Sequence, residues 1–365
     1  MDSRHRTGSG GDGRGSDRAD RADRVVRPGI RAVARAAGVS PTTVSHTFSG
    51  SRGVRAETRD RVLRAAATLG YTPNRIAQGL RRRRTGVIGL ASDRIATTPF
   101  AGRIVQGAQE VAREHDLLLM LVDSEGDREL ESRQIRALAA QQVDGVLMAR
   151  MSHQVVGRPG GLGELRVVLV DGAPEAGWAV DAVVPDEEGI AATAVERFVA
   201  AGHRRIAFVN ADEDAPAVSG RADGFASALE RAGLDAPRSM IVSAQSDAVG
   251  GRRAGRSLLD REPVARPTAV FCFNDQMAMG VYQAADALGL AVPTDVSVIG
   301  VDDLELVSAA LEPGLTTIAL PHREMGRAGM KTLLAMIEGA APREPVTTRL
   351  RCELVERGSV ASPPV

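Results

Sequence analysis

The chain contains few of the residues that mark disulfide-bonded, metal-binding or ring-stacking proteins. Its 365 residues include only two cysteines, Cys272 and Cys352, both in apolar or strand-like surroundings. A disulfide framework is therefore not expected, and such cysteines fit a reducing cytoplasm. No metal-ligand spacing occurs, so no metal or other cofactor is expected. Aromatic residues make up 3% of the chain, too few to indicate one type of ring as a ligand.

Long apolar stretches are also missing. No run of 18 apolar residues is present, so no segment is predicted to span a membrane. Residues 1–28 consist almost throughout of Gly, Ser, Asp and Arg. Such a segment is not a signal peptide and cannot bury enough surface to fold, so we expect a disordered tail there and a cytoplasmic protein.

Catalytic constellations are absent as well, and we do not expect an enzyme. His203 stands beside Arg204 and Arg205, but no serine, cysteine or carboxylate accompanies it at the spacing of a nucleophile or an orienting group. The glycines of segment 160–163 resemble a phosphate-binding loop only superficially, because a preceding strand and a following Lys-Ser/Thr are both missing. We interpret that segment as a surface loop.

A helix-turn-helix pattern follows the N-terminal tail. Apolar residues recur at helical spacing up to Ala37, and Gly38 then permits the positive φ of a helix C-terminus. A second helix is predicted from Pro41 to Phe48, because Ser40 is a good N-cap and proline suits the first helical position. Four polar residues are expected on the outer face of this helix: Thr42, Thr43, Ser45 and His46.

Two further helical segments follow. An apolar stripe and a charged face predict a third helix over 56–69, which Gly70 ends. A short helix is predicted after Pro73 as far as Leu80, and four consecutive arginines occupy 81–84. A helix-turn-helix beside a basic run indicates contact with DNA.

Charge is balanced over the whole chain but not along it. Lys and Arg number 46, as do Asp and Glu. Residues 1–85 hold 19 basic against 7 acidic residues, a net +12, and residues 86–365 hold 27 against 39, a net −12. A charge run is often only a solvated surface, but its coincidence with the helix-turn-helix favours phosphate contact. A basic arm against DNA is the alternative for residues 1–28, although interleaved aspartates cancel most of that attraction.

From Gly86 onward, short apolar runs alternate with amphipathic stretches, as in βαβ repeats with a mostly parallel sheet. Strands are predicted at 87–91, 117–123, 145–149, 167–171, 182–185, 205–210, 240–243, 269–273 and 297–301. Helices are predicted at 100–114, 129–142, 187–201, 221–232, 251–260 and 275–288. The pattern restarts after Asp186, which implies two open sheets, and the C-terminal segment can return to complete one of them. A ligand is then expected in a cleft beyond the carboxyl ends of the strands.

Polar residues at those strand ends are the candidate ligand contacts. Asp171, Asn274 and Asp302 each follow a predicted strand, and Arg221 opens a predicted helix. Carboxylates and amides accept from hydroxyl or ring N–H groups, and arginine donates, so the set suits a small polyol or heterocycle. A helix N-cap is the alternative role of a strand-end Asp or Asn, and we interpret Asp275 and Asp303 as caps.

Residues 29–90 closely resemble the DNA-binding head and hinge of the lactose-repressor (LacI) family. The head motifs are Ala37-Gly38-Val39-Ser40, Thr43-Val44-Ser45, Leu69-Gly70-Tyr71-Thr72-Pro73-Asn74 and Ile76-Ala77. The rest resembles the family's core, which is similar to periplasmic sugar-binding proteins. The core motifs are Gly202-His203-Arg204-Arg205-Ile206-Ala207, Arg221-Ala222-Asp223-Gly224-Phe225, Asn274-Asp275-Gln276-Met277-Ala278-Met279-Gly280, Gly300-Val301-Asp302-Asp303 and Leu315-Thr316-Thr317-Ile318.

The resemblance implies a multidomain chain with a small all-α helix-turn-helix head and an α/β two-lobed core like a periplasmic binding protein. The head would occupy 29–72, the hinge helix and linker 73–85, and the effector-binding and dimerisation core 86–357, with a disordered tail at 358–365. One lobe would comprise about 86–183 and 321–348, and the other about 184–320 and 349–357.

The same resemblance implies a sequence-specific transcriptional regulator, expected to be a repressor, that binds a near-palindromic operator as a homodimer. The helix from Pro41 would lie in the major groove, with Thr42 and His46 at base edges and Thr43 and Ser45 at phosphates. Arg52 is a further base or phosphate contact. The hinge would fold on DNA, with contacts from Asn74 and Ala77 and with Leu80 wedged into the minor groove.

A small-molecule effector would bind between the lobes and shift operator affinity by linkage. The family's effector contacts match Asp171, Arg221, Asn274 and Asp302, and Phe100 is a candidate for apolar cover over a ring. Phe273 is another, although a core position is the better interpretation. A sugar, a sugar phosphate and a nucleobase all remain open, with a sugar expected from the habit of the family. The alternative function is a transporter's solute-binding protein, which shares this core but requires export.

Overall fold

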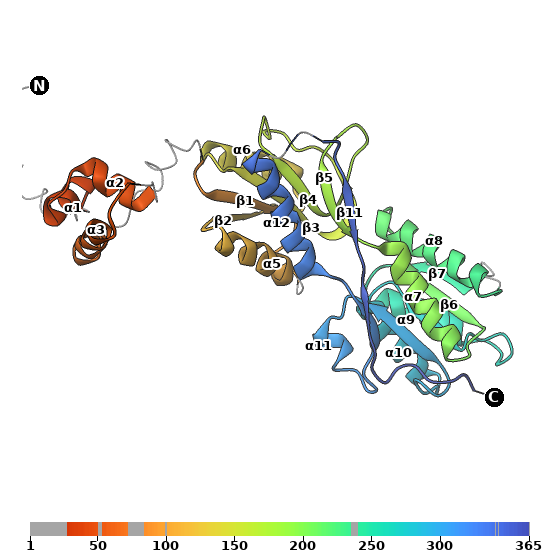
Figure 1. Ribbon diagram of the computed structural model, residues 1–365. Coiled ribbons are helices and arrows are strands. Elements are labelled where there is room, and N and C mark those ends of the chain that lie inside the picture. Colours follow the sequence, from red (N-terminus) through yellow and green to blue (C-terminus); the bar gives the residue numbers. More distant parts are fainter. Residues whose placement is uncertain are drawn as a thin grey trace, which may run out of the picture. The chain divides into compact units, whose positions relative to one another are not determined.

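The computed structural model describes residues 28–49, 53–71, 84–98, 101–234, 240–339, 341 and 343–364. The chain divides into two compact units, Met1–Arg83 and Arg84–Val365. Each unit is described by itself (Figure 1). The tail predicted at 1–28 lies, except for Pro28, outside the described residues, as does the hinge predicted at 73–85 except for its last two residues.

The first unit contains the three predicted helices, α1 (Ile30–Ala37), α2 (Pro41–Ser49) and α3 (Ala56–Thr68). Gly38 ends α1 with φ 62°, as the sequence predicted. The helices enclose a small core in which six residues are buried: Val33, Ala34, Ala37, Val44, Val62 and Ala66. The tri-helical head expected from the sequence is confirmed.

The second unit is built on two six-stranded sheets. The first sheet, with strand order β11-β5-β4-β3-β1-β2, is parallel throughout. Its strands are β1 (Val87–Ser92), β2 (Leu118–Asp123), β3 (Gly145–Val156), β4 (Val167–Pro174), β5 (Asp181–Pro185) and β11 (Thr347–Leu350). Helices α5 (Ala101–Glu114) and α12 (His322–Glu338) cover one face, and α6 (Arg128–Ala140) covers the other. We call this layered body lobe 1.

Lobe 2 has the corresponding strand order β12-β10-β9-β8-β6-β7, but its edge strand β12 runs antiparallel to β10. Its strands are β6 (Ile206–Ala211), β7 (Ile241–Ala244), β8 (Ala269–Cys272), β9 (Ser297–Val301), β10 (Thr316–Ala319) and β12 (Glu353–Val355). Helices α7 (Glu187–Ala200) and α8 (Pro216–Arg231) cover one face, and α9 (Ala248–Leu259) and α10 (Asp275–Ala287) cover the other. A short helix, α11 (Glu305–Ser308), follows β9. The chain passes between lobes after β5, after β10 and between β11 and β12.

Several elements differ from the prediction. The sequence pattern did not predict α12 or the short strands β10, β11 and β12, and α8 begins at Pro216 rather than Arg221. The C-terminal segment completes both sheets rather than one, because β11 pairs with β5 and β12 pairs with β10. No helix of the described residues is long and apolar enough to cross a membrane.

The prediction of a disordered tail at 358–365 is wrong for residues 358–364. Ser359 is fully buried; its Oγ donates to the Val298 carbonyl at 2.6 Å and accepts from the Thr316 amide at 2.8 Å. The Ala361 carbonyl lies 2.8 Å from Nε2 of His203. These bonds satisfy polar groups of lobe 2, so the segment is part of its fold. His203 is buried in this network, with Thr268 and Ser297 as further partners.

Candidate functional site

The N-terminus of α2 is fixed by local hydrogen bonds. Ser40 is the predicted N-cap, and its Oγ accepts from the Thr43 amide at 3.1 Å. The Ser40 and Thr43 hydroxyl oxygens are 2.9 Å apart, and the Thr47 hydroxyl donates to the Thr43 carbonyl at 2.9 Å. Val44 is fully buried against the other helices. These contacts set which face of α2 remains outside.

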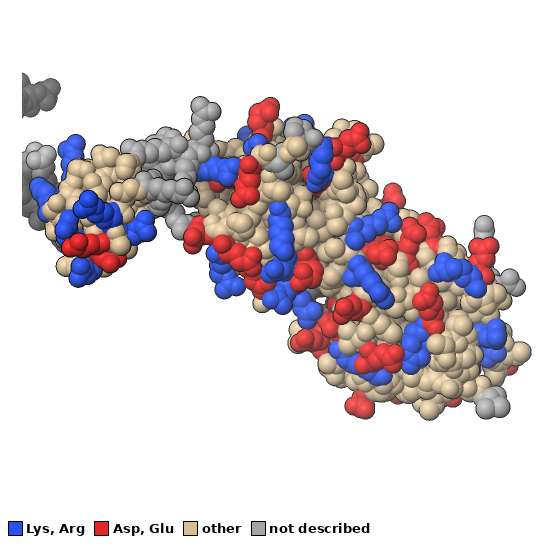
Figure 2. All heavy atoms as spheres, viewed as in Figure 1, with Lys and Arg blue, Asp and Glu red and all other residues tan. Residues whose placement is uncertain are grey.

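That outer face carries Thr42 and His46, which are both exposed, while Thr43 and Ser45 are half-buried. Residues four apart lie on one side of a helix, so Thr42 and His46 form a common surface. Basic side chains spread over the visible face of this unit, and acidic ones gather in one place (Figure 2). Its exposed arginines are Arg31, Arg35, Arg55, Arg59, Arg61 and Arg64, against the exposed acids Glu57 and Asp60.

Five predicted site residues lie outside the part of the chain that the structure describes. They are Arg52, Asn74, Ala77, Leu80 and Phe100.

Asp171 lies where β3 and β4 lose their regular register. The pairing shifts between Ala149 and Gln154, so four residues of β3 stand opposite Asp171 alone. Asp171 has φ 56° and is 2% exposed, and its Oδ1 has no hydrogen-bond partner in the described part of the chain. A buried acceptor without a donor is costly, which makes this oxygen a candidate ligand contact.

Arg221 and Glu187 form a buried ion pair in lobe 2. Nε of Arg221, in α8, donates to Oε2 of Glu187, the first residue of α7, at 2.8 Å. The Arg221 guanidinium also donates from Nη1 to the Phe273 carbonyl and lies 4.2 Å from the centre of the Phe273 ring. Neither hydrogen bond uses Nη2. Phe273 packs against both hydrophobic clusters of lobe 2, in agreement with the core interpretation.

Glu187 also links the two lobes. Its Oε1 lies 3.1 Å from Nδ1 of His153, which belongs to the irregular part of β3 in lobe 1. Both side chains are about nine-tenths buried, at 11% exposure for His153 and 6% for Glu187. The pair joins the lobes close to Asp171, because His153 is one of the four β3 residues that stand opposite Asp171 where the strand pairing shifts.

The three carboxyl groups of this region have shifted pKa values. Burial, and then the negative charge of Glu187, raise the pKa of Asp171 well above its usual range, against the opposing effect of Arg221. Burial and the neighbouring Asp275 likewise raise the pKa of Asp302. Burial works to raise the pKa of Glu187 too, but Arg221 and His153 outweigh it and the net shift is downward. The mutual influence of these groups indicates one electrostatic cluster, which we call the interlobe cluster: Asp171, Glu187, Arg221 and Asp302.

Asn274 acts as the N-cap of α10. Its Oδ1 accepts from the Met277 amide at 2.7 Å, and its Nδ2 donates to the Ser246 carbonyl at 3.0 Å. An amide has further capacity, so one N–H and one lone pair stay available.

The interpretation of Asp275 and Asp303 as caps is wrong. Asp275 is fully buried and accepts from the Thr317 hydroxyl at 2.6 Å and the Leu304 amide at 2.8 Å. Asp303 accepts from Nη2 of Arg357 at 2.7 Å. Both aspartates hold together the loop after β9, where Asp302 has φ 110°.

Two residues of this region were missed by sequence reasoning. Glu187 follows the N-cap Asp186 and looked like an ordinary acidic residue of a first helical turn. His153 lies in a stretch for which the sequence predicted neither strand nor helix. No local pattern marks either residue, because their partners are 34 positions away in the chain. Among the described residues, no cluster of His, Cys, Asp and Glu could hold a metal ion.

Comparisons with known proteins agree with both units. Residues 29–74 match the model for bacterial regulatory proteins of the lacI family, and residues 195–360 match a periplasmic binding protein-like domain. The HTH-type transcriptional repressor PurR of Aliivibrio fischeri is 32% identical over 333 residues, which cover 91% of this chain and 98% of PurR. The ribose operon repressor of Escherichia coli is 33% identical, with 90% and 99% covered.

Solved structures show the same likeness. The lac repressor dimer bound to operator and the anti-inducer ONPF is 26% identical, has a TM-score of 0.74 and covers 92% of this chain and 99% of its own. The regulator CelR in complex with cellobiose is 32% identical, has a TM-score of 0.63 and covers 91% and 100%. The expected head and two-lobed core are thus confirmed. The chain belongs to the LacI family of DNA-binding transcriptional regulators with an effector-binding core.

Proposed function

We propose that the protein is a cytoplasmic repressor that binds a near-palindromic operator as a homodimer. Thr42 and His46 of α2 contact base edges, and Thr43 and Ser45 contact phosphates. Arg52, Asn74, Ala77 and Leu80 complete the interface. The single observation that carries this proposal is the capped α2, which presents Thr42 and His46 together on an outer face of an arginine-rich domain. Two such heads require a symmetric dimer, and the similar lac repressor is a dimer in its complex with operator.

Selection of bound duplexes from a random pool, with full-length protein, tests the operator proposal. A palindrome is expected, and His46→Ala should relax one position in each half-site at a cost of roughly 1–3 kcal/mol. His115→Ala removes an exposed histidine of the second unit and should leave the selected sequence unchanged. Binding without a consensus, or an identical consensus for His46→Ala, would contradict the assignment.

We further propose that the effector is an uncharged polyhydroxylated molecule, a sugar in preference to a sugar phosphate, bound at the interlobe cluster. Asp171 and Asp302 accept from hydroxyls, and Arg221 donates from Nη2. Asp171 and Asp302 are neutral when protonated and negative when ionised, so neither supplies a positive charge. The positive charge of Arg221 is already paired with Glu187. The described cluster therefore has no surplus cation for a phosphate. Ring N–H groups of a nucleobase also suit these acceptors, which keeps the nucleobase as the second candidate.

The effector proposal is tested by calorimetric titration of the protein with ribose, cellobiose, ribose 5-phosphate and hypoxanthine. A neutral sugar should bind, and Asp302→Asn should weaken it about tenfold to 100-fold by altering a hydrogen bond to a carboxyl group. Asp260→Asn, on an exposed aspartate of the same lobe, is the matched control and should bind normally. Binding of the phosphate ester alone, or an unaffected Asp302→Asn, would overturn the proposal. Operator binding measured with and without the bound sugar then gives the sign of regulation.

A further inference from the structure

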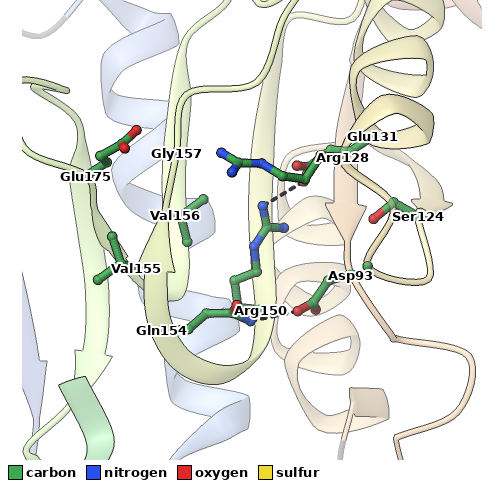
Figure 3. A pocket seen from close by; sticks show the side chains of 11 residues that line it. Asp93, Ser124, Arg128, Glu131, Arg150, Gln154, Val155, Val156, Gly157 and Glu175 are labelled. Atoms are coloured by element: carbon green, nitrogen blue, oxygen red, sulfur yellow. Dashed lines mark hydrogen bonds and ion pairs between the residues drawn. The ribbon is translucent and has the colours of Figure 1, made fainter. Parts of the chain in front are cut away.

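A polar cavity lies within lobe 1, apart from the interlobe cluster. It has a volume of about 360 Å³, and none of the four interlobe-cluster residues lines it. It exists because β3 and β4 continue past their register shift, with Gln154–Val156 paired to Gly172–Pro174, and their tips stand opposite the first turn of α6. Figure 3 shows these walls facing one another, with charged side chains between them.

Arg150 supplies a buried donor without a complete set of partners. The residue is 6% exposed, and its Nη2 donates to Oε1 of Glu131 at 2.6 Å. Its Nη1 is buried and has no hydrogen-bond partner among the described residues. In Figure 3 the side chain extends across the cavity toward Glu131 and Arg128. A buried guanidinium N–H favours an acceptor, and a carboxylate is the acceptor that best matches its geometry.

The outer wall carries a cation and an anion that do not pair with each other. Arg128 and Glu175 are both exposed, and no ion pair joins them within the described structure. Gly157 lies between their side-chain ends, and a Cβ at that position would collide with the Arg128 guanidinium and stand 3.1 Å from Oε2 of Glu175. The bare backbone of Gly157 therefore leaves room for both charged groups to face the cavity.

The remaining charges limit what can bind. Asp93 is already satisfied, because its two oxygens accept from the Met151 amide at 3.1 Å and from Nε2 of Gln154 at 2.8 Å. Glu131 and Glu175 make the cavity unfavourable for a dianion such as phosphate. Arg150 and Arg128 favour one carboxylate, and Glu175 favours one protonated amine.

We propose that this cavity binds a free α-amino acid or a zwitterion of similar size. The ligand carboxylate accepts from Nη1 of Arg150 and from Arg128, and its ammonium group donates to Glu175. The cavity volume is at the low end of the range for small-molecule sites, which fits a ligand of this size. The site is distinct from the sugar site proposed between the lobes, so the full-length protein has two ligands on one core.

The proposal is tested by titrating the full-length protein with each of the twenty common L-amino acids and following both heat of binding and unfolding temperature. At least one should bind, while acetate, methylamine and inorganic phosphate at the same millimolar concentration should not. Arg128→Gln and Glu175→Gln should each weaken binding about tenfold or more. Because both side chains are exposed and unpaired with each other, the free variants should unfold at the parent temperature. Arg253→Gln and Glu262→Gln, on exposed residues of lobe 2, should bind like the parent.

Several distinct results would contradict the proposal of an amino-acid site in lobe 1. Binding that is unchanged in both Arg128→Gln and Glu175→Gln, or an equal effect of acetate, overturns the proposal, as does the absence of binding by every amino acid. Asp302→Asn belongs to the interlobe cluster and should leave amino-acid binding intact. If it abolishes that binding, the amino acid occupies the interlobe site and the lobe 1 proposal is wrong, whatever the sugar titrations give.

Discussion

The two lobes share one topology but complete it differently. In each sheet the first strand is flanked by the second and third, two more follow outward, and a C-terminal strand closes that edge. In lobe 2 the third and fourth strands, β8 and β9, are joined through α10, whereas the corresponding β3 and β4 of lobe 1 are joined by residues 157–166 without a helix. Without that helix, β3 and β4 extend past the ends of their pairing with β1 and β5 and border a polar cavity. The same topology thus allows an additional pocket where one crossover is reduced to a loop.

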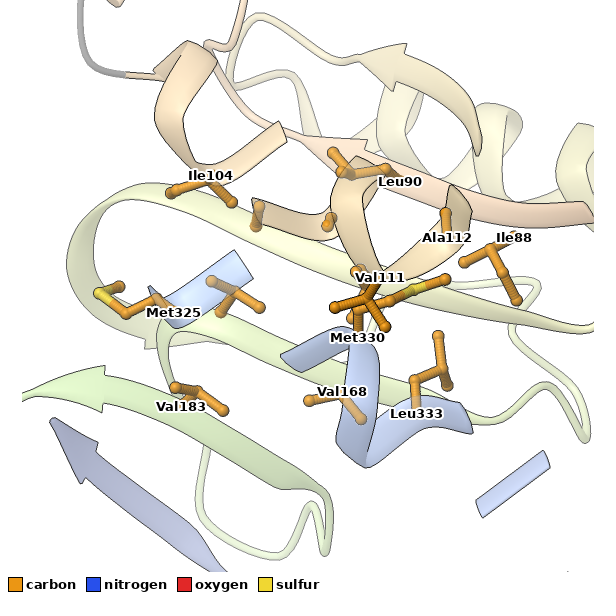
Figure 4. Packing of buried hydrophobic residues seen from close by; sticks show 14 of the residues in the cluster. Ile88, Leu90, Ile104, Val111, Ala112, Val168, Val183, Met325, Met330 and Leu333 are labelled. Carbon is orange, nitrogen blue, oxygen red and sulfur yellow. The ribbon is translucent and has the colours of Figure 1, made fainter. Parts of the chain in front are cut away.

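The cores differ as well. In lobe 2, Phe208 stacks on Phe271 with ring centres 4.7 Å apart and meets Phe225 at 5.2 Å. The α5/α12 side of lobe 1 is filled by aliphatic residues and methionines, among them Met325, Met330 and Leu333 (Figure 4). Aromatic rings bury large rigid surfaces, while methionine adapts to irregular gaps. The α7/α8 side of lobe 2 is accordingly filled by larger and more rigid side chains than the α5/α12 side of lobe 1.

Close helix packing through glycine is common to both lobes. A Cβ on Gly326 of α12 would collide with the Ile104 carbonyl of α5, and a Cβ on Gly280 of α10 would collide with the Ala248 carbonyl of α9. In each pair, the glycine therefore lets the backbones of the two helices pack directly against each other. The lobes differ in side-chain chemistry and in their connections, not in how their outer helices meet.

The largest expected effect is a pH dependence of stability that arises from Asp275 in lobe 2. Burial raises the pKa of Asp275 to about 7, from an ordinary value of 3.8. Between these values the folded protein keeps a proton that the unfolded chain has released, so stability falls as the pH rises through this window, by up to roughly 4 kcal/mol. Asp275→Asn should remove the contribution of Asp275 to this slope. Urea unfolding of parent and variant between pH 4 and pH 7 measures the difference.

The difference between the two proteins isolates Asp275. Burial lowers the pKa of His322 to about 4 from 6.5, which gives an opposite slope, with stability lost as the pH falls. Both proteins carry His322, so its contribution cancels in the subtraction. Parallel stability curves for parent and variant would contradict the prediction.

How far the sequence predicts this fold depends on how local the determinants are. The helices of the head follow from Ser40, Pro41 and Gly38, whose capping and φ preferences act within a few residues. The nine predicted strands of the core follow from short apolar runs. The missed strands β10, β11 and β12 have three or four residues each and form only where a preceding sheet offers an edge. Helix α12 was missed although its buried stripe is long, because its glycines weaken a helical pattern. Those glycines are explained only by close contact, of Gly326 with α5 and of Gly329 with side chains of β3 and β4.

The candidate sites show the same division. Strand ends and family likeness identified Asp171, Arg221 and Asp302 as candidates. Glu187 and His153 depend on which distant elements meet, and no local spacing encodes that. The tail from Gly358 looked disordered because it is short and contains Gly, Ser and Pro, yet its polar groups complete hydrogen bonds of lobe 2. A composition-based prediction cannot anticipate a segment that becomes ordered by docking on a finished sheet.

A smaller effect should follow from removing the buried Ser359 hydroxyl. Ser359→Ala leaves the Thr316 amide and the Val298 carbonyl without these partners, which should cost roughly 3 kcal/mol. Hydrogen exchange should increase in peptides of β9 and β10 and stay unchanged in those of β3 and β4. Ser257→Ala removes a hydroxyl that bonds only within its own helix, and is the matched control. Equal exchange increases in both lobes would show that they open together.

The smallest expected effect concerns the bond between the lobes. His153→Ala removes the partner of Glu187 Oε1 but leaves the Glu187–Arg221 ion pair in place, so the cost should be about 1–2 kcal/mol. We expect this contact to help the two lobes unfold together. Calorimetry of the variant should therefore show a broader core transition than that of the parent. In hydrogen exchange, lobe 1 peptides of the variant should exchange before those of lobe 2. His115→Ala, on an exposed residue in the turn after α5, should reproduce the parent trace. An equally sharp transition in His153→Ala would mean that the three chain crossings, rather than this contact, couple the lobes.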